Sequence, residues 1–328
     1  MPKVEPFSDE QSRLLVNLEQ RYQVWMEAER TLRDLPYDLR RKEIHGRAYL
    51  YEINDRGGNG RSLGPWSPAA EEKLEEYRAR KVQAKQRRES SRVGVNEACR
   101  LYRALRLPML ASEAGAILRE ADRRRLLGEP LLLVGTNAMI AYAVEAGGII
   151  REAPDETQDF DLAWTAKRKR DDKSTLWDML KAVDPTFTVN TERSFQARNA
   201  NAYEVEILVA PSRAGTMART DRPRPVPLAE QEWLLNGTPV DRVVACRDSL
   251  PARIVAPDPR WFALHKLWLS KQAKRSPLKR KKDAKQGLLL LEAVAETMPQ
   301  YPLDDGFAAS LPPELKEHFD AWQNWRRG

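Results

Sequence analysis

The segment from Leu131 to Trp164 constrains this chain more than any other. It reads LLLVGTNAMIAYAVEAGGIIREAPDETQDFDLAW: an apolar run ends at Gly135, a helical pattern follows, and Asp159 and Asp161 come next. Side chains two residues apart on a strand point to the same face, so these carboxylates lie side by side. Adjacent carboxylates repel each other unless a cation relieves the repulsion. The segment therefore predicts a site for a divalent metal and a nucleotide.

A third acid is expected on a neighbouring strand. In the segment 203–209, Glu204 and Glu206 alternate with apolar residues and share one face. Spacing does not choose between them, and Glu206 is favoured because Val205 and Ile207 are both strong core formers. Mg²⁺ binds a few carboxylates together with water and phosphate oxygens, which this set would supply. The alternative is an edge strand with one solvated face.

Gly135, Thr136 and Asn137 stand where a predicted strand over 131–134 meets a predicted helix over 137–146. Glycine lets the backbone approach a ligand closely. A helix N-terminus offers free N–H groups and a positive dipole end, both suited to phosphate. The three residues are therefore candidates for nucleotide binding. The alternative is that Thr136 or Asn137 only caps the helix.

Charge is unevenly distributed along the chain. Its 328 residues carry 55 Lys and Arg against 48 Asp and Glu, a net charge of +7. Nine basic residues and one acidic residue lie in the segment 266–285, and the segment 78–92 is nearly as basic. Such patches favour polyanions such as RNA or a nucleoside triphosphate. A solvated helix face is the alternative for each segment.

The sequence predicts a cytoplasmic protein that does not enter a membrane. It has no run of about 18 apolar residues, as a membrane span would need. Its start, MPKVEPFSDEQ, has no apolar core of a secretory signal. Cys99 and Cys246 are then expected to be free, buried thiols.

The motifs together resemble the polymerase-β-like nucleotidyltransferase superfamily. Its pattern is an apolar strand, Gly-Gly or Gly-Ser, a helix, Asp-x-Asp on the next strand and a third acid on a later strand. The likeness is greatest to a poorly characterised bacterial group of this superfamily. It rests on VGTNA at 134–138, QDFDL at 158–162, GRAYLY at 46–51 and FALHKLW at 262–268. Thr136 replaces the usual Gly or Ser, and the third acid is Glu.

The resemblance implies an α+β fold with a mixed-sheet nucleotidyltransferase core, N-terminal helices with a hairpin and a C-terminal helical region. Three regions are expected: 1–127 with the hairpin at 47–63, the core over 128–256, and helices over 257–328. Besides the helix over 137–146, helices are predicted over 8–33, 67–92, 95–107, 111–127, 173–183, 258–272, 278–298 and 313–326.

The resemblance also implies a metal-dependent transfer of a nucleoside monophosphate from a nucleoside triphosphate to an acceptor. Asp159, Asp161 and Glu206 would be the catalytic ligands of Mg²⁺ or Mn²⁺, with Glu204 as the alternative third acid. The basic segments favour RNA as acceptor over a small molecule or a protein hydroxyl. The alternative function is an inactive module of this fold that binds nucleic acid or a protein partner.

Basic residues near the C-terminus complete the implied site. Lys266 would neutralise the triphosphate. Lys282 and Asp283 resemble a basic–Asp pair of related abortive-infection toxins and small antitoxin-type proteins. By this resemblance, Asp283 would orient a basic group. The alternative is that Asp283 merely offsets the surrounding positive charge. The sequence does not distinguish a toxin from a modifying enzyme, or a monomer from a homo-oligomer.

Overall fold

The computed structural model describes residues 3–153, 159–169 and 175–327. The chain forms two compact units. The large unit comprises the residues up to Glu19 together with those from Ala98 onward, and the small unit comprises Gln20–Glu97. The division into three sequence regions stays a prediction.

The large unit alternates strands with short helices before a helical C-terminal part. Its strands are β1 Val4–Pro6, β5 Leu131–Val134, β6 Gly148–Ile150, β7 Asp159–Trp164, β8 Thr188–Val189, β9 Gln196–Arg198, β10 Glu204–Val209, β11 Val240–Ala245 and β12 Pro251–Ala256. Its helices are α3 Ser112–Arg123, α4 Met139–Glu145, α5 Leu176–Val183, α6 Pro259–Lys271, α7 Pro277–Thr297, α8 Asp305–Ser310 and α9 Pro313–Arg327. Three 3-10 segments are η1 Thr136–Ala138, η2 Pro211–Thr216 and η3 Ala229–Leu235.

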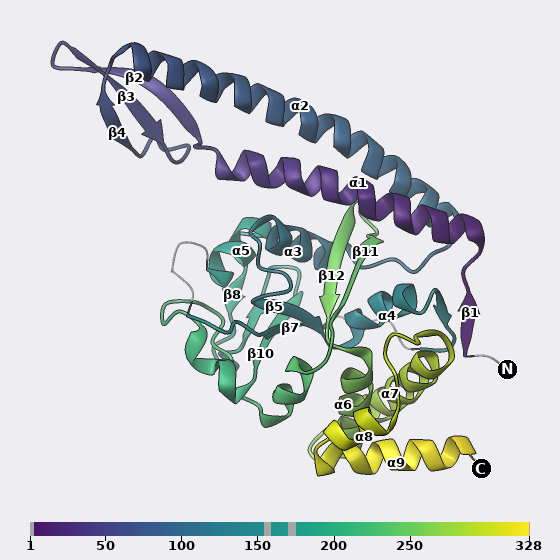
Figure 1. Cartoon of the computed structure of the whole chain (residues 1–328). Helices are drawn as coiled ribbons and strands as arrows, with labels where there is room; N and C mark the ends of the chain where they lie inside the picture. The colour runs from purple at the N-terminus through teal and green to yellow at the C-terminus, as the bar shows by residue number, and fades with distance from the viewer. Residues whose placement is uncertain (1–2, 154–158, 170–174, 328) are drawn as a thin grey trace. The chain divides into compact units, whose positions relative to one another are not determined.

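A five-stranded mixed sheet lies at the centre of the large unit (Figure 1). Its order is β5-β7-β10-β9-β8; β7 and β10 are parallel, and the other neighbours are antiparallel. Phe160 and Leu162 of β7, and Val205 and Ile207 of β10, are fully buried. Because acids alternate with these residues, the acids of both strands face the other way. The expected α+β fold with a mixed sheet is confirmed.

The C-terminal helices α6 to α9 gather beside this sheet (Figure 1). Helix α6 begins after Asp258, whose side chain accepts a hydrogen bond from the Arg260 N–H. Helices α6 and α7 approach closely at Gly287, where a Cβ atom would lie 2.7 Å from the carbonyl oxygen of Ala263. This close packing brings the basic start of α7 towards α6.

The small unit contains a three-stranded antiparallel sheet, β2 Asp38–Ile44, β3 Arg47–Ile53 and β4 Gly60–Pro65. Part of α1 Asp9–Asp34 and part of α2 Pro68–Ala104 also belong to it and run antiparallel to each other (Figure 1). Its core contains Leu39, Leu50, Leu74 and Tyr77. The predicted hairpin at 47–63 is thus two strands of a larger sheet.

Several predicted elements need correction. The helices predicted over 67–92 and 95–107 are one helix, α2, which continues through Gly94. The helix predicted over 137–146 is the 3-10 turn η1 followed by α4. Strands β1, β2 and β6 and helix α8 were not predicted. Cys99 and Cys246 are free and buried, as expected. No helix within the described ranges is both long and apolar enough to span a membrane.

Candidate functional site

The acids of β7 and β10 lie side by side across the sheet. In the parallel pairing of these strands, Asp161 is opposite Glu206 and Asp159 is opposite Glu204. Asp159, Asp161 and Glu206 line a cavity of about 290 Å³. The structure does not bring Glu204 to the cavity wall; its carboxylate accepts a hydrogen bond from Arg198 Nε at 2.8 Å. Geometry therefore favours Glu206 over Glu204 as the third acid.

The carboxylate of Asp161 is held in an unfavourable environment. Its pKa is raised to about 7, first by burial and then by the negative charges of Glu206 and Asp159, against the opposing charges of Lys266 and Lys279. Neighbouring carboxylates in a desolvated place favour either a proton or a cation between them. The site thus has the electrostatic character of a cation-binding site.

Gly135 makes room for this carboxylate. The residue has φ 72° and ψ −162°, a conformation that is essentially confined to glycine. A Cβ atom there would collide with Oδ2 of Asp161. Gly135 itself lines the cavity, so the backbone stays open to a ligand at this point.

Thr136 and Asn137 are buried and fix the surroundings of the cavity. Thr136 Oγ1 accepts a hydrogen bond from Gln286 Nε2 at 3.3 Å, and Asn137 Nδ2 donates one to the carbonyl oxygen of Asp159 at 3.1 Å. Neither side chain caps the helix. Their hydrogen bonds instead tie the turn to α7 and to the strand that carries Asp159.

A buried ion pair sets the position of Lys266. Its Nζ lies 2.9 Å from Oδ1 of Asp283, and Arg275 binds the other oxygen of the same carboxylate. Although burial acts in the opposite direction, Lys266 and Arg275 lower the pKa of Asp283. Lys266 and Arg275 both line the cavity, whereas Lys282 does not. Asp283 therefore touches two basic groups of the cavity wall.

A second ion pair lies at the exposed side of the cavity. Lys279 Nζ lies 3.1 Å from Oδ2 of Asp159, and the lysine side chain is 58 % exposed. Gln196 Nε2 donates to Glu206 Oε1 at 3.0 Å. Across the described part of the chain, no three His, Cys, Asp or Glu side chains form a ready-made metal site. In this arrangement a lysine and an amide contact two of the three carboxylates.

The far wall of the cavity has a different character. It consists mainly of apolar side chains from β10, η3 and α6, among them Leu208, Leu234 and Phe262. Gln231 and His265 also line it, and both are buried. Gln231, Arg275 and Lys279 were not predicted individually from the sequence, although the last two lie inside the basic segment 266–285.

The comparisons with known proteins agree with this geometry. A family model described as Nucleotidyltransferase matches residues 112–311, more than half of the chain. The match includes β5, β7, β10, η3, α6 and α7, and every cavity residue discussed above lies within the matched residues. Neither curated proteins nor solved structures contain a match to the chain. Because the family model matches more than half of the chain, and the sheet and its acids agree with it, the chain belongs to the nucleotidyltransferase family.

Proposed function

We propose that this protein transfers a nucleoside monophosphate from a nucleoside triphosphate to an acceptor hydroxyl, with RNA as the favoured acceptor. The observation that carries the proposal is the shared cavity of Asp159, Asp161, Glu206 and Lys266. Carboxylates at one place and cations beside them match a metal ion and a triphosphate.

Asp159, Asp161 and Glu206 would hold Mg²⁺ or Mn²⁺. The donor set fits, because all three ligands are oxygens and the desolvated carboxylate of Asp161 gains most from a cation. Bound there, the ion would neutralise charge on the α-phosphate and make the acceptor hydroxyl more nucleophilic. Competition comes from Lys279, but an ion pair this exposed contributes only about 0–1 kcal/mol. Lys279 can therefore leave Asp159 when a divalent ion arrives.

The cations of the cavity wall would bind the triphosphate. Lys266 is fixed by Asp283, so its charge is already in position before the substrate binds. Arg275 shares this anchor, and Lys279 becomes free to contact phosphate once it leaves Asp159. The positive charge of all three would favour the developing pyrophosphate.

The reaction is a displacement at the α-phosphorus. The acceptor oxygen forms a bond to this phosphorus while the bond to the oxygen that bridges to the β-phosphate breaks. Pyrophosphate leaves with the electron pair of that bond, and the proton of the acceptor hydroxyl passes to solvent. The cavity residues orient the two oxygens and screen their charges.

The decisive experiment uses nucleoside triphosphates labelled at the α-phosphate, with Mg²⁺ or Mn²⁺ and total RNA or cell extract. Label on a macromolecule is expected with the wild type and not with Asp161→Asn or Glu206→Gln. Glu204→Gln is the matched control, because Glu204 lies on the same strand outside the cavity wall, and it should keep activity. Incorporation that survives in Asp161→Asn would refute the proposed site.

Metal binding is measured separately from activity. Titration of Mn²⁺ followed by electron spin resonance should show a bound ion in the wild type and weaker binding of the ion in Asp161→Asn. If Mn²⁺ binds and no nucleotide is transferred to any acceptor, the results favour the alternative function, an inactive module that binds nucleic acid or a protein partner. Its nucleic-acid affinity should then fall steeply with salt.

A further inference from the structure

The apolar wall of the cavity contains buried polar atoms without partners. Gln231 is 4 % exposed and His265 is 5 % exposed. Gln231 Oε1 and both ring nitrogens of His265 have no hydrogen-bond partner among the described residues. A buried polar atom that lacks a partner is unfavourable, so three such atoms on two residues that line the cavity favour a ligand that supplies the hydrogen bonds.

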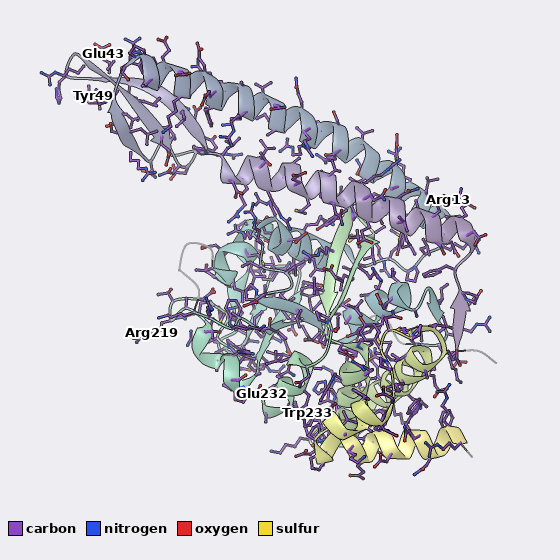
Figure 2. The ribbon with its side chains drawn as sticks, in the orientation of Figure 1. Arg13, Glu43, Tyr49, Arg219, Glu232 and Trp233 are labelled. Carbon is purple, nitrogen blue, oxygen red and sulfur yellow. The ribbon has the colours of Figure 1, made fainter. Side chains whose placement is uncertain are left out.

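The elements around Gln231 hold its backbone in place, and its N–H donates to the carbonyl oxygen of Leu228 at 3.1 Å. Segment η3 packs against α6. Glu232 and Trp233 occupy the neighbouring positions of η3 (Figure 2). Glu232 accepts hydrogen bonds from the N–H and hydroxyl of Ser212, and Trp233 packs edge-on against Trp268. Those two side chains are thus engaged elsewhere, whereas Gln231 lines the cavity.

The chemistry of this wall fits a flat heterocycle with polar edges. Leu208, Leu234 and Phe262 offer apolar surface to the faces of a ring. Gln231 Oε1 can only accept a hydrogen bond, so the ligand must donate one to it. Neutral His265 offers one donor and one acceptor. A nucleobase has apolar faces and polar edges of this kind.

We infer that this wall binds the base of the nucleoside triphosphate and that Gln231 selects bases with an exocyclic amino group. The inference rests on the proposed function, because the same cavity must hold the triphosphate. An amino group, as in adenine or cytosine, donates to Gln231 Oε1. A keto oxygen at the same position, as in hypoxanthine or uracil, cannot donate and leaves the Gln231 oxygen unpaired. A glutamine amide is also the side chain that pairs with the amino edge of adenine.

The test compares nucleotides that differ at this group. ATP and inosine triphosphate differ by amino against keto, as do CTP and UTP. Dissociation constants are measured by calorimetry with Mg²⁺ on the full-length wild type and on Gln231→Leu. In the wild type, the amino member of each pair is expected to bind about 5- to 100-fold more tightly, as a lost buried hydrogen bond implies. In Gln231→Leu, both ratios should fall to about 1.

Glu232→Gln is the matched control, since Glu232 lies on the same segment and its carboxylate is bound to Ser212; both ratios should stay as in the wild type. Gln231→Leu removes an unpartnered buried oxygen, so its midpoint in thermal unfolding should not fall. If Gln231 had a purely structural role, the substitution would lower this midpoint.

The outcomes separate the two proposals. Equal affinities of the wild type for both members of each pair would overturn the selection of amino bases while leaving the proposed transfer intact. Selectivity that persists in Gln231→Leu would overturn the role of Gln231. If the wild type binds none of the four nucleotides with Mg²⁺ or Mn²⁺, the proposed function fails together with this inference.

Discussion

His265 should make this protein sensitive to acid. Its ring lies beside two tryptophans that pack against each other, with centroids 6.2 Å from Trp233 and 6.4 Å from Trp268. Burial, and then the charge of Lys266, lower the pKa of His265 from 6.5 to about 3. Below pH 6.5 the unfolded chain therefore takes up a proton that the folded chain refuses, so the unfolded state gains stability as the pH falls.

The magnitude follows from the two pKa values. The contribution is fully present above pH 6.5 and declines by up to about 1.4 kcal/mol per pH unit as the pH falls towards 3. Between pH 7.5 and pH 4.5 the free energy of unfolding should drop by about 3 kcal/mol through this residue alone. His265→Phe keeps an aromatic ring beside the tryptophans and removes the titrating group. The variant should lack this part of the acid sensitivity.

Urea unfolding at both pH values measures the difference, with tryptophan fluorescence as the signal. Other titrating groups act equally in wild type and variant, so they cancel in the comparison. His318→Gln is the control. His318 is only partly buried; burial lowers its pKa and Glu317 opposes the shift, so a smaller change is expected. If wild type and His265→Phe lose the same free energy between the two pH values, the argument from burial is wrong.

Two further predictions concern the turn and the buried ion pair. Gly135→Ala and Gly147→Ala both put a side chain at positive φ, at a cost of about 1–2 kcal/mol, but only the first collides with a carboxylate of the site. Urea unfolding should therefore show the larger loss of stability for Gly135→Ala, and only that variant should lose Mn²⁺ binding. Equal behaviour of the two variants would refute the close approach of Gly135 to Asp161. Asp283→Asn leaves Lys266 buried without its counterion and should lower the free energy of unfolding by about 3 kcal/mol. Asp320→Asn, at an exposed pair, should change it by less than about 1 kcal/mol, and similar losses in both variants would contradict the assigned burial.

The acids of the site could be predicted because their pattern is local. In β7 and β10, acids alternate with apolar residues that must enter the core, so burial of Phe160 and Val205 fixes which way Asp161 and Glu206 point. The sequence could not show how the strands pair. The parallel register that sets Asp161 opposite Glu206 arises from the whole sheet.

Other features depended on context that no local pattern reveals. Strand β2, DLRRKEI, has one buried residue, Leu39, and its charged residues hide the alternation that usually identifies a strand. Two helices were predicted where α2 is continuous through Gly94; one glycine lowers helix stability by only about 1 kcal/mol, which tertiary packing can offset. Gln231 lies in a 3-10 segment after a proline-rich connection, where periodicity carries no information.

The basic segment 266–285 shows most clearly what packing adds to sequence. As a sequence it is a single positively charged run, yet its cations are held very differently. The side chains of Lys266 and Asp283 are 6 % and 3 % exposed, and separating them would leave a buried charge unpaired. Those of Lys279 and Asp159 are 58 % and 35 % exposed, so solvent can replace either partner at little cost. One lysine is therefore a permanent part of the cavity wall, and the other can exchange a carboxylate for a ligand. Charge counting predicts the attraction of a polyanion to both, but only burial distinguishes the fixed cation from the exchangeable one.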